Sequence, residues 1–137
     1  SEESVRFMNI PRELRYTSTH EWVRVKGGIA TVGITDYAQH QLSEITYVEL
    51  PDLNDDVNVS DEVAFVESVK AASDVYAPVS GKIIEVNSAV AEEPERINRD
   101  PYGEGWLFKI RMSDPKEVAN LLDADSYEEQ LPPDEEE

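Results

Sequence analysis

The alternation of apolar and polar residues along this chain predicts short β-strands separated by turns. Between Tyr16 and Ile34, β-prone residues flank Gly27-Gly28, which predicts a hairpin closed by a Gly-Gly turn. Similar runs predict further strands at residues 45–50, 63–68, 75–77, 82–86 and 106–112. Short strands at close spacing are typical of a small sandwich or a flattened barrel.

Two helices are predicted among these strands. Asp36 is suited to cap a short internal helix in which Ala38 and Leu42 share a face. Near the end, Asp114-Pro115-Lys116-Glu117 supplies an N-cap, a first-turn proline and a glutamate three residues after the cap. The sequence thus predicts a mainly β fold with a short internal helix and a C-terminal helix.

The domain organisation follows from the length and from the two ends. A chain of 137 residues with 39% hydrophobic content supports one hydrophobic core. We expect one domain over residues 8–131, because Met8 resembles a native start and residues 1–7 are interpreted as an N-terminal extension. The acidic stretch 132–137 has little apolar surface to bury and is expected to be disordered.

Charge and composition exclude several classes of partner. With 30 acidic against 12 basic residues the formal charge is −18, and such a surface repels nucleic-acid phosphates and anionic membranes. No apolar run reaches the roughly 18 residues that span a bilayer. The chain has no cysteine, so any sulfur redox chemistry requires a cofactor. We therefore expect neither a nucleic-acid nor a membrane partner.

Patterns typical of catalysis are scarce. His20 and His40 lie twenty residues apart, and no HExxH, GxSxG, Walker or GxGxxG pattern occurs. Among so many acids, neighbouring carboxylates carry no weight as evidence for acid–base catalysis. Lys70 stands out because it occupies the predicted hairpin tip between residues 63–68 and 75–77, followed by small residues. On position alone it is either an ordinary surface lysine or a modification target.

The stretch around Lys70 carries a family resemblance. Val66 to Gly81 contains E-S-V-K-A-A-S-D-V-Y-A-P and closely resembles the lipoylation hairpin of glycine cleavage H proteins, in which this lysine is acylated. Lipoyl domains of 2-oxoacid dehydrogenases and biotin carriers typically show D-K-A or M-K-M instead. Further landmarks in family order lie at residues 16–22, 33–39, 47–51, 85–87 and 98–107. The chain departs from the pattern at Ser43 and Ser60, where the family often has glycine, and at Asn54 in a similar turn.

The resemblance implies both a fold and a carrier role. The expected fold is a small barrel-sandwich hybrid of the lipoyl-domain type, with lipoic acid attached to Lys70. The arm is expected to carry the aminomethyl group of glycine from the pyridoxal-phosphate glycine decarboxylase (P protein) to the tetrahydrofolate-dependent aminomethyltransferase (T protein). Dihydrolipoyl dehydrogenase (L protein) then reoxidises the arm, and lipoylating enzymes attach it. The chain itself is expected to catalyse none of these steps.

The resemblance also suggests roles for residues near the arm. A loaded aminomethyl group bears an ammonium that needs a carboxylate when shielded, and Glu21 is the candidate, with His20 beside it. Glu67, Ser68 and Asp74 are candidate contacts for lipoylating enzymes and partners. The alternatives are a solvated strand position for Glu21, a packing role for His20 and simple turn solvation for the other three.

Three other functions remain open on sequence grounds. The chain could be a lipoyl or biotinyl domain of a larger complex, although the long match outside the hairpin argues against it. It could be a β interaction module in which Lys70 stays free, or a relay that passes lipoyl groups to other acceptors. The expected compartment is the bacterial cytoplasm, with the mitochondrial matrix as the alternative.

Overall fold

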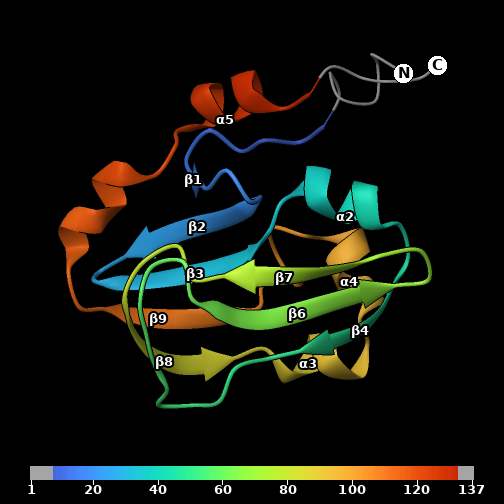
Figure 1. Ribbon diagram of the computed structural model, residues 1–137, viewed down its shortest axis with the longest axis horizontal. Helices are drawn as coiled ribbons and strands as arrows, with labels where there is room; N and C mark the ends of the chain where they lie inside the picture. The colour runs from blue at the N-terminus through green and yellow to red at the C-terminus, as the bar shows by residue number, and fades with distance from the viewer. Residues whose placement is uncertain (1–7, 133–137) are drawn as a thin grey trace.

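Two β-sheets share one hydrophobic core in the computed structural model, which describes residues 8–132 (Figure 1). The larger sheet contains, in spatial order, β1 (Arg15–Tyr16), β2 (Glu21–Lys26), β3 (Ile29–Ile34), β9 (Phe108–Met112), β8 (Gly81–Val86) and β5 (Asp56–Val57). The smaller sheet contains β4 (Ile45–Glu49), β6 (Glu62–Ser68) and β7 (Ala72–Tyr76). The predictions for residues 1–7 and for the tail beyond Pro132 lie outside the described residues.

The helices lie at the margins of the two sheets. They are α2 (Asp36–Leu42), α3 (Ser88–Glu92), α4 (Glu95–Arg99), the 3₁₀-helix η1 (Pro115–Asn120) and α5 (Ala124–Gln130). The predicted mainly β fold with a short internal helix and a C-terminal helix is confirmed. No helix in the described part of the chain has the length and apolar character needed to cross a membrane.

The predicted β2–β3 hairpin is confirmed, with a register that runs from Glu21 opposite Ile34 to Lys26 opposite Ile29. Gly27 and Gly28 close it with φ angles of 57° and 83°. These left-handed conformations favour glycine, so the Gly-Gly pair fits its position.

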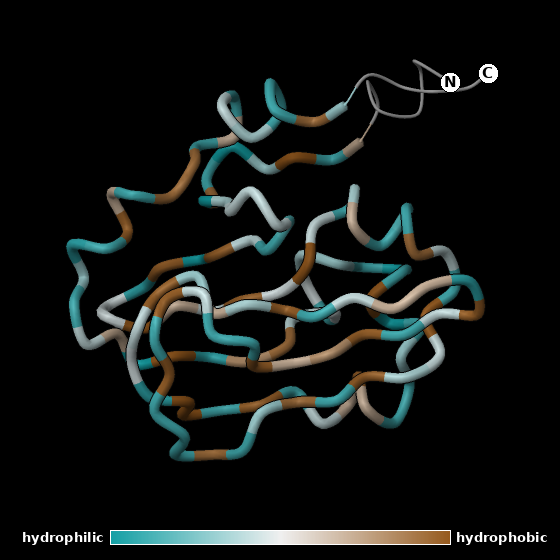
Figure 2. Tube along the Cα trace, in the orientation of Figure 1, coloured by the Kyte–Doolittle hydropathy of each residue, from teal (hydrophilic) through white to brown (hydrophobic). Residues whose placement is uncertain are grey.

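The main core lies between the sheets and is made by inward-facing strand residues. Figure 2 shows hydrophobic and hydrophilic residues interspersed along the strands, as the alternation in sequence requires. Phe108 and Ile110 of β9 are fully buried and Met112 is nearly so, which confirms the alternation predicted there. Val66 of β6 meets them from the smaller sheet and is also fully buried.

A second, aromatic cluster fixes the C-terminal helix α5 to one end of the larger sheet. Tyr127 of α5 stacks on Tyr16 of β1, with ring centroids 4.7 Å apart and planes inclined by 12°. Trp22 is fully buried, and its Nε1 donates to the carbonyl oxygen of Pro101 at 2.9 Å. Gly33 makes room for that indole, because a Cβ there would come within 2.6 Å of Nε1.

The predicted helix starts need correction. Thr35, rather than Asp36, caps α2, because its Oγ1 accepts from the backbone N–H of Ala38 at 3.2 Å. Asp114 does cap a helix, but that helix is the 3₁₀ segment η1, and the C-terminal α-helix α5 begins only at Ala124. Glu117 does not turn back to the cap, because its carboxylate accepts from Ser80.

Other segments were not predicted. Helices α3 and α4 and the two-residue strand β5 are too short to leave a periodic pattern. The link after β6 is also shorter than expected, because β7 already begins at Ala72.

Candidate functional site

Lys70 lies at the tip of the β6–β7 hairpin, as predicted. The antiparallel pairing reaches Glu67 opposite Ala72, so only a short turn separates the two strands around the lysine. Lys70 and its neighbour Val69 are exposed. The hairpin therefore presents an accessible primary amine at its end.

Ser68 fixes the backbone of this tip. Its Oγ accepts from the N–H groups of Lys70 at 3.2 Å and of Ala71 at 3.1 Å, and it donates to the carbonyl oxygen of Ala71. The backbone N–H of Ser68 also donates to that carbonyl oxygen, at 2.8 Å. Ser68 is buried, and its hydrogen bonds stabilise the turn. Its predicted contact with partner enzymes stays a prediction.

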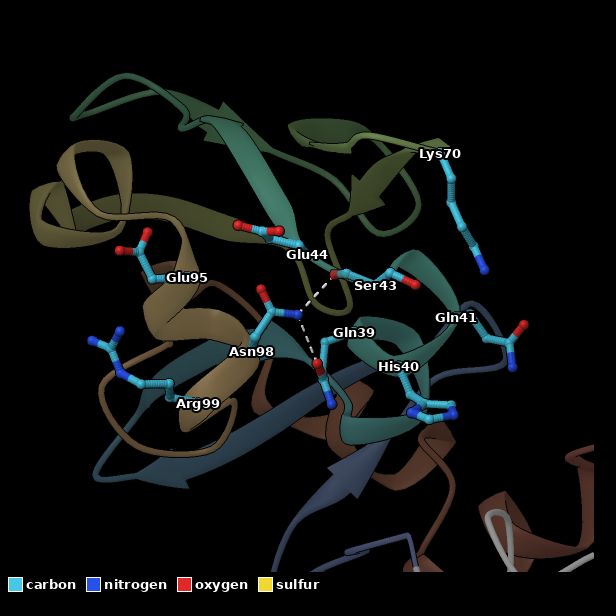
Figure 3. Close-up of a pocket in the computed structure, with 9 residues that line it drawn as sticks. All are labelled: Gln39, His40, Gln41, Ser43, Glu44, Lys70, Glu95, Asn98 and Arg99. Carbon is cyan, nitrogen blue, oxygen red and sulfur yellow. Dashed lines mark hydrogen bonds between the residues drawn. The ribbon is translucent and has the colours of Figure 1, made fainter. Parts of the chain in front are cut away.

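Beside the tip, Lys70 lines an open cavity of about 560 Å³ formed with helices α2 and α4 (Figure 3). The other lining residues are Gln39, His40, Gln41, Ser43, Glu44, Glu95, Asn98 and Arg99. In Figure 3 the Lys70 side chain extends from the hairpin toward the side of Gln41, away from Glu95 and Arg99. The amine is thus beside the cavity without being enclosed by it.

Asn98 of α4 ties the walls of this cavity together. Its Nδ2 donates to Oε1 of Gln39 and to the carbonyl oxygen of Ser43, both at 2.8 Å. Its Oδ1 accepts from the backbone N–H of Ile45 at 2.9 Å, so one side chain links α4, α2 and the start of β4. Ser43, which ends α2, has φ 66° and ψ −148°, a conformation that is costly for any residue with a Cβ.

Glu21 is buried, with 1% of its surface exposed, and hydrogen bonds hold both oxygens of its carboxylate. Its Oε1 accepts from the hydroxyls of Thr17 and Thr19, and its Oε2 accepts from the backbone N–H of Tyr76 at 3.0 Å. Burial raises the pKa of Glu21, although the three donors oppose that shift. The carboxylate therefore joins β2 to the end of β7.

His20 has a different set of contacts although it precedes Glu21 in sequence. Its Nδ1 lies 2.8 Å from the hydroxyl of Tyr127, and that hydroxyl lies 2.7 Å from Oγ1 of Thr35. Burial lowers the pKa of His20, which favours the neutral imidazole. Its φ of 77° is unusual for a residue with a side chain. His20 thus links α5 to the segment that begins α2.

The predicted site residues do not form a single cluster around Lys70. Glu67 and Asp74 are exposed on β6 and β7, while Glu21 lines a second cavity of about 560 Å³ with Thr19, Tyr76 and residues of η1. None of these residues, nor His20 or Ser68, lines the cavity beside Lys70. Their predicted roles remain predictions.

Sequence reasoning missed the contribution of α4 to this cavity. Glu95, Asn98 and Arg99 are separated from Lys70 by more than twenty residues, and only tertiary packing brings them near it. The one available signal was the landmark that begins at Asn98, which marks the segment without revealing its location.

Comparison with known proteins decides the family. The family model described as "Glycine cleavage H-protein" matches residues 14–134. The chain belongs to this family. The glycine cleavage system H protein of Methylacidiphilum infernorum is 56% identical over 124 residues, which cover 90% of this chain and 97% of that protein. The corresponding protein of Alteromonas mediterranea is 55% identical, with 90% and 96% covered.

A solved structure supports the same glycine cleavage H-protein assignment. The crystal structure of a glycine cleavage system H protein from Mycobacterium marinum aligns with a TM-score of 0.81 at 38% sequence identity, covering 88% of this chain and 98% of that one. The predicted barrel-sandwich fold of lipoyl-domain type is confirmed. Membership in the H-protein family also argues against a lipoyl or biotinyl domain of another complex.

Proposed function

We propose that this chain is the lipoyl-carrying component of a glycine cleavage system and that lipoic acid is attached to Nζ of Lys70. The observation that carries the proposal is the position of Lys70 at an exposed hairpin tip in a member of the H-protein family. Ser68 holds the backbone of that tip, so the amine is presented in a defined place. A fixed tip favours recognition by an enzyme that must select one lysine among several.

The residues present fit a lipoyl arm. The Nζ of Lys70, as the free amine, would attack an activated lipoyl carboxyl group and displace the activating group, and the resulting amide would carry no positive charge. The cavity of about 560 Å³ between the tip, α2 and α4 leaves room beside the modified side chain. When bound, lipoic acid supplies the disulfide–dithiol couple that this cysteine-free chain lacks.

We infer a carrier role rather than a catalytic one. The chain would take the aminomethyl group of glycine from the P protein to the T protein, and electrons to the L protein. The family match supports this role, because the proteins that this chain matches over nearly their whole length are named glycine cleavage system H proteins. The relatives compared are bacterial, which favours the bacterial cytoplasm as the compartment. The carrier domain is proposed to span residues 8–131.

Further residues are proposed to act around the arm. Glu67 and Asp74 are exposed on the strands that lead to Lys70, so a lipoylating enzyme that grips the hairpin meets them, and Ser68 keeps the tip in shape. The carboxylate of Glu21 accepts from the backbone N–H of Tyr76, at the end of β7 that is far from Lys70. An arm that folds back from Lys70 along β7 would point toward this carboxylate. His20, which precedes Glu21 in sequence, is proposed to stand beside it near the arm, with its ring held by the hydroxyl of Tyr127.

A reconstituted glycine cleavage reaction tests this function. Purified P, T and L proteins with glycine, tetrahydrofolate and NAD should form NADH only when the lipoylated chain is added. Lys70→Arg keeps the charge and length of the side chain but cannot form the amide, so it should be inactive. Lys82→Arg, at another exposed lysine, serves as the matched control and should be fully active. NADH formation with Lys70→Arg would refute the assignment.

A further inference from the structure

The outer face of the smaller sheet carries an aromatic pair between carboxylates, in which Tyr47 is exposed and Phe65 is half-buried. Cross-strand pairing places Tyr47 beside Glu67, and Glu49 beside Phe65, which in turn lies beside Asp74. Residues that pair across antiparallel strands point to the same side, so all five share the face turned away from the core. We call Tyr47, Glu49, Phe65, Glu67 and Asp74 the acidic aromatic face.

The aromatic pair at its centre is unusual for a surface. Tyr47 is 48% exposed, and its ring lies 6.4 Å from that of Phe65 in an edge-to-face arrangement. A hollow of about 460 Å³ adjoins the pair and is lined in part by Glu49, Phe65 and Asp74. Aromatic residues that remain in contact with water beside a hollow are characteristic of protein interaction sites.

The charge around this face has one sign. Between Gln41 and Gly81 the chain has nine acidic residues and a single basic one, Lys70. In the described part of the chain, the ion pair that involves one of these nine acids joins Asp56 to Lys82, at 3.2 Å. The carboxylates of the acidic aromatic face therefore lack a cation from their own sheet. Amide formation on Lys70 removes the remaining positive charge of the segment.

We propose that the acidic aromatic face docks an arginine-bearing surface around the active-site entrance of the glycine decarboxylase. Guanidinium groups stack on aromatic rings and donate paired hydrogen bonds to carboxylates, and this face offers both kinds of partner. Glycine carries a carboxylate and the cofactor of the decarboxylase a phosphate, and a positively charged entrance would attract both of these anions. The inference rests on the proposed carrier function.

The position of the face matches this role. Strands β6 and β7 carry Phe65, Glu67 and Asp74, and the turn that joins these two strands holds Lys70. Strand β4, which carries Tyr47 and Glu49, pairs with β6 in the same sheet (Figure 1). A partner that binds the face is therefore next to the attachment point of the arm. A second copy of the chain does not fit, because its own acidic face would be repelled.

The test measures how the rate of glycine-dependent carbon dioxide exchange by the decarboxylase varies with the concentration of lipoylated carrier. Tyr47→Ala and Glu49→Gln should each raise the KM for the carrier, by about tenfold and about threefold, with kcat unchanged. Glu129→Gln removes an exposed carboxylate on α5 and is the matched control. Intact mass confirms lipoylation of each variant, and circular dichroism confirms its fold.

The possible results of this test separate the docking proposal from the carrier function on which it rests. A raised KM for Tyr47→Ala and Glu49→Gln, with Glu129→Gln equal to the wild type, supports the docking face. An active wild type with equal KM in all variants overturns the docking face alone. If the variants change the oligomeric state but not the KM, the face serves self-association and the proposal is overturned. A wild type that is not lipoylated or is inactive overturns the carrier function and the docking face together.

Discussion

The carboxylate of Glu21 is surrounded by donors from two separate parts of the chain. Glu21→Ala removes the acceptor for Thr17, Thr19 and the N–H of Tyr76. We expect a loss of about 2–4 kcal/mol in the free energy of unfolding, from the unpaired donors and the cavity left behind. Urea denaturation measures it. Glu67→Ala, on an exposed site, is the control and should stay within about 0.5 kcal/mol of the wild type.

Glu21 should also make the free energy of unfolding depend on pH, in a direction that follows from its raised pKa. Burial raises the pKa of Glu21 above its ordinary value of 4.5, so the folded state binds this proton more tightly than the unfolded state does. The stability that this group contributes is present below pH 4.5 and is lost as the pH rises through the raised pKa. Because Glu21→Gln does not titrate, the stability advantage of the wild type over this variant should decline as the pH rises above 4.5. A stability advantage of the wild type that stays constant or grows with pH would contradict a raised pKa of Glu21.

Ser43 holds a conformation suited to glycine. Its φ of 66° and ψ of −148° place its Cβ in a costly position at the end of α2. Ser43→Gly should therefore stabilise the fold by about 1 kcal/mol, measured by thermal or urea unfolding. Ser43→Ala keeps the Cβ and should give no such gain. Equal effects of the two substitutions would show that backbone strain at Ser43 is absent.

At the scale of elements, the hydroxyl of Tyr127 adds to the aromatic packing that holds helix α5 on the body. Tyr127→Phe removes the contacts with His20 Nδ1 and Thr35 Oγ1 but keeps the stacking on Tyr16. We expect a loss of about 1–2 kcal/mol in the free energy of unfolding and faster amide hydrogen exchange in α5. Tyr47→Phe removes an exposed hydroxyl and is the control. Unchanged exchange in α5 would argue against this link.

The elements that sequence could predict are those with a strong local pattern. The β2–β3 hairpin follows from its Gly-Gly turn, and β9 follows from its alternation of buried residues. Helix α4 has five residues after Pro94 and no periodic apolar face, so its packing against α2 was not visible. The helix expected at Asp114 is a 3₁₀ segment whose Glu117 binds Ser80, a contact across 37 positions of sequence.

The candidate site also has a part that local sequence predicts and a part that depends on residues distant in sequence. Lys70 and its hairpin are local and were predicted from a contiguous stretch of sequence. The cavity beside Lys70 depends on Asn98, which joins three elements that are distant in sequence. The buried carboxylate of Glu21 likewise accepts from the N–H of Tyr76, which lies far along the chain. Local patterns therefore identify the attachment point but not its surroundings.

The whole molecule carries a large negative charge that opposes its compact state. A formal charge of −18 on 137 residues produces self-repulsion that dissolved salt screens. Because the Debye length falls from about 30 Å at 0.01 M to about 10 Å at 0.1 M salt, we expect the Tm to rise by a few degrees between these concentrations of sodium chloride. Calorimetry at fixed pH measures this change. A Tm that falls with salt would show that ion pairs such as Arg96 with Glu93 outweigh the repulsion.

The central claim is that Lys70 carries the arm of the carrier. Peptide mass spectrometry tests it on protein co-expressed with a lipoyl ligase and lipoic acid, for the wild type, Lys70→Arg and Lys82→Arg. The account predicts a lipoyl mass increment on the peptide that contains Lys70 in the wild type and in Lys82→Arg, and no increment in Lys70→Arg. A wild type with unmodified Lys70, or an increment on another lysine, would contradict it.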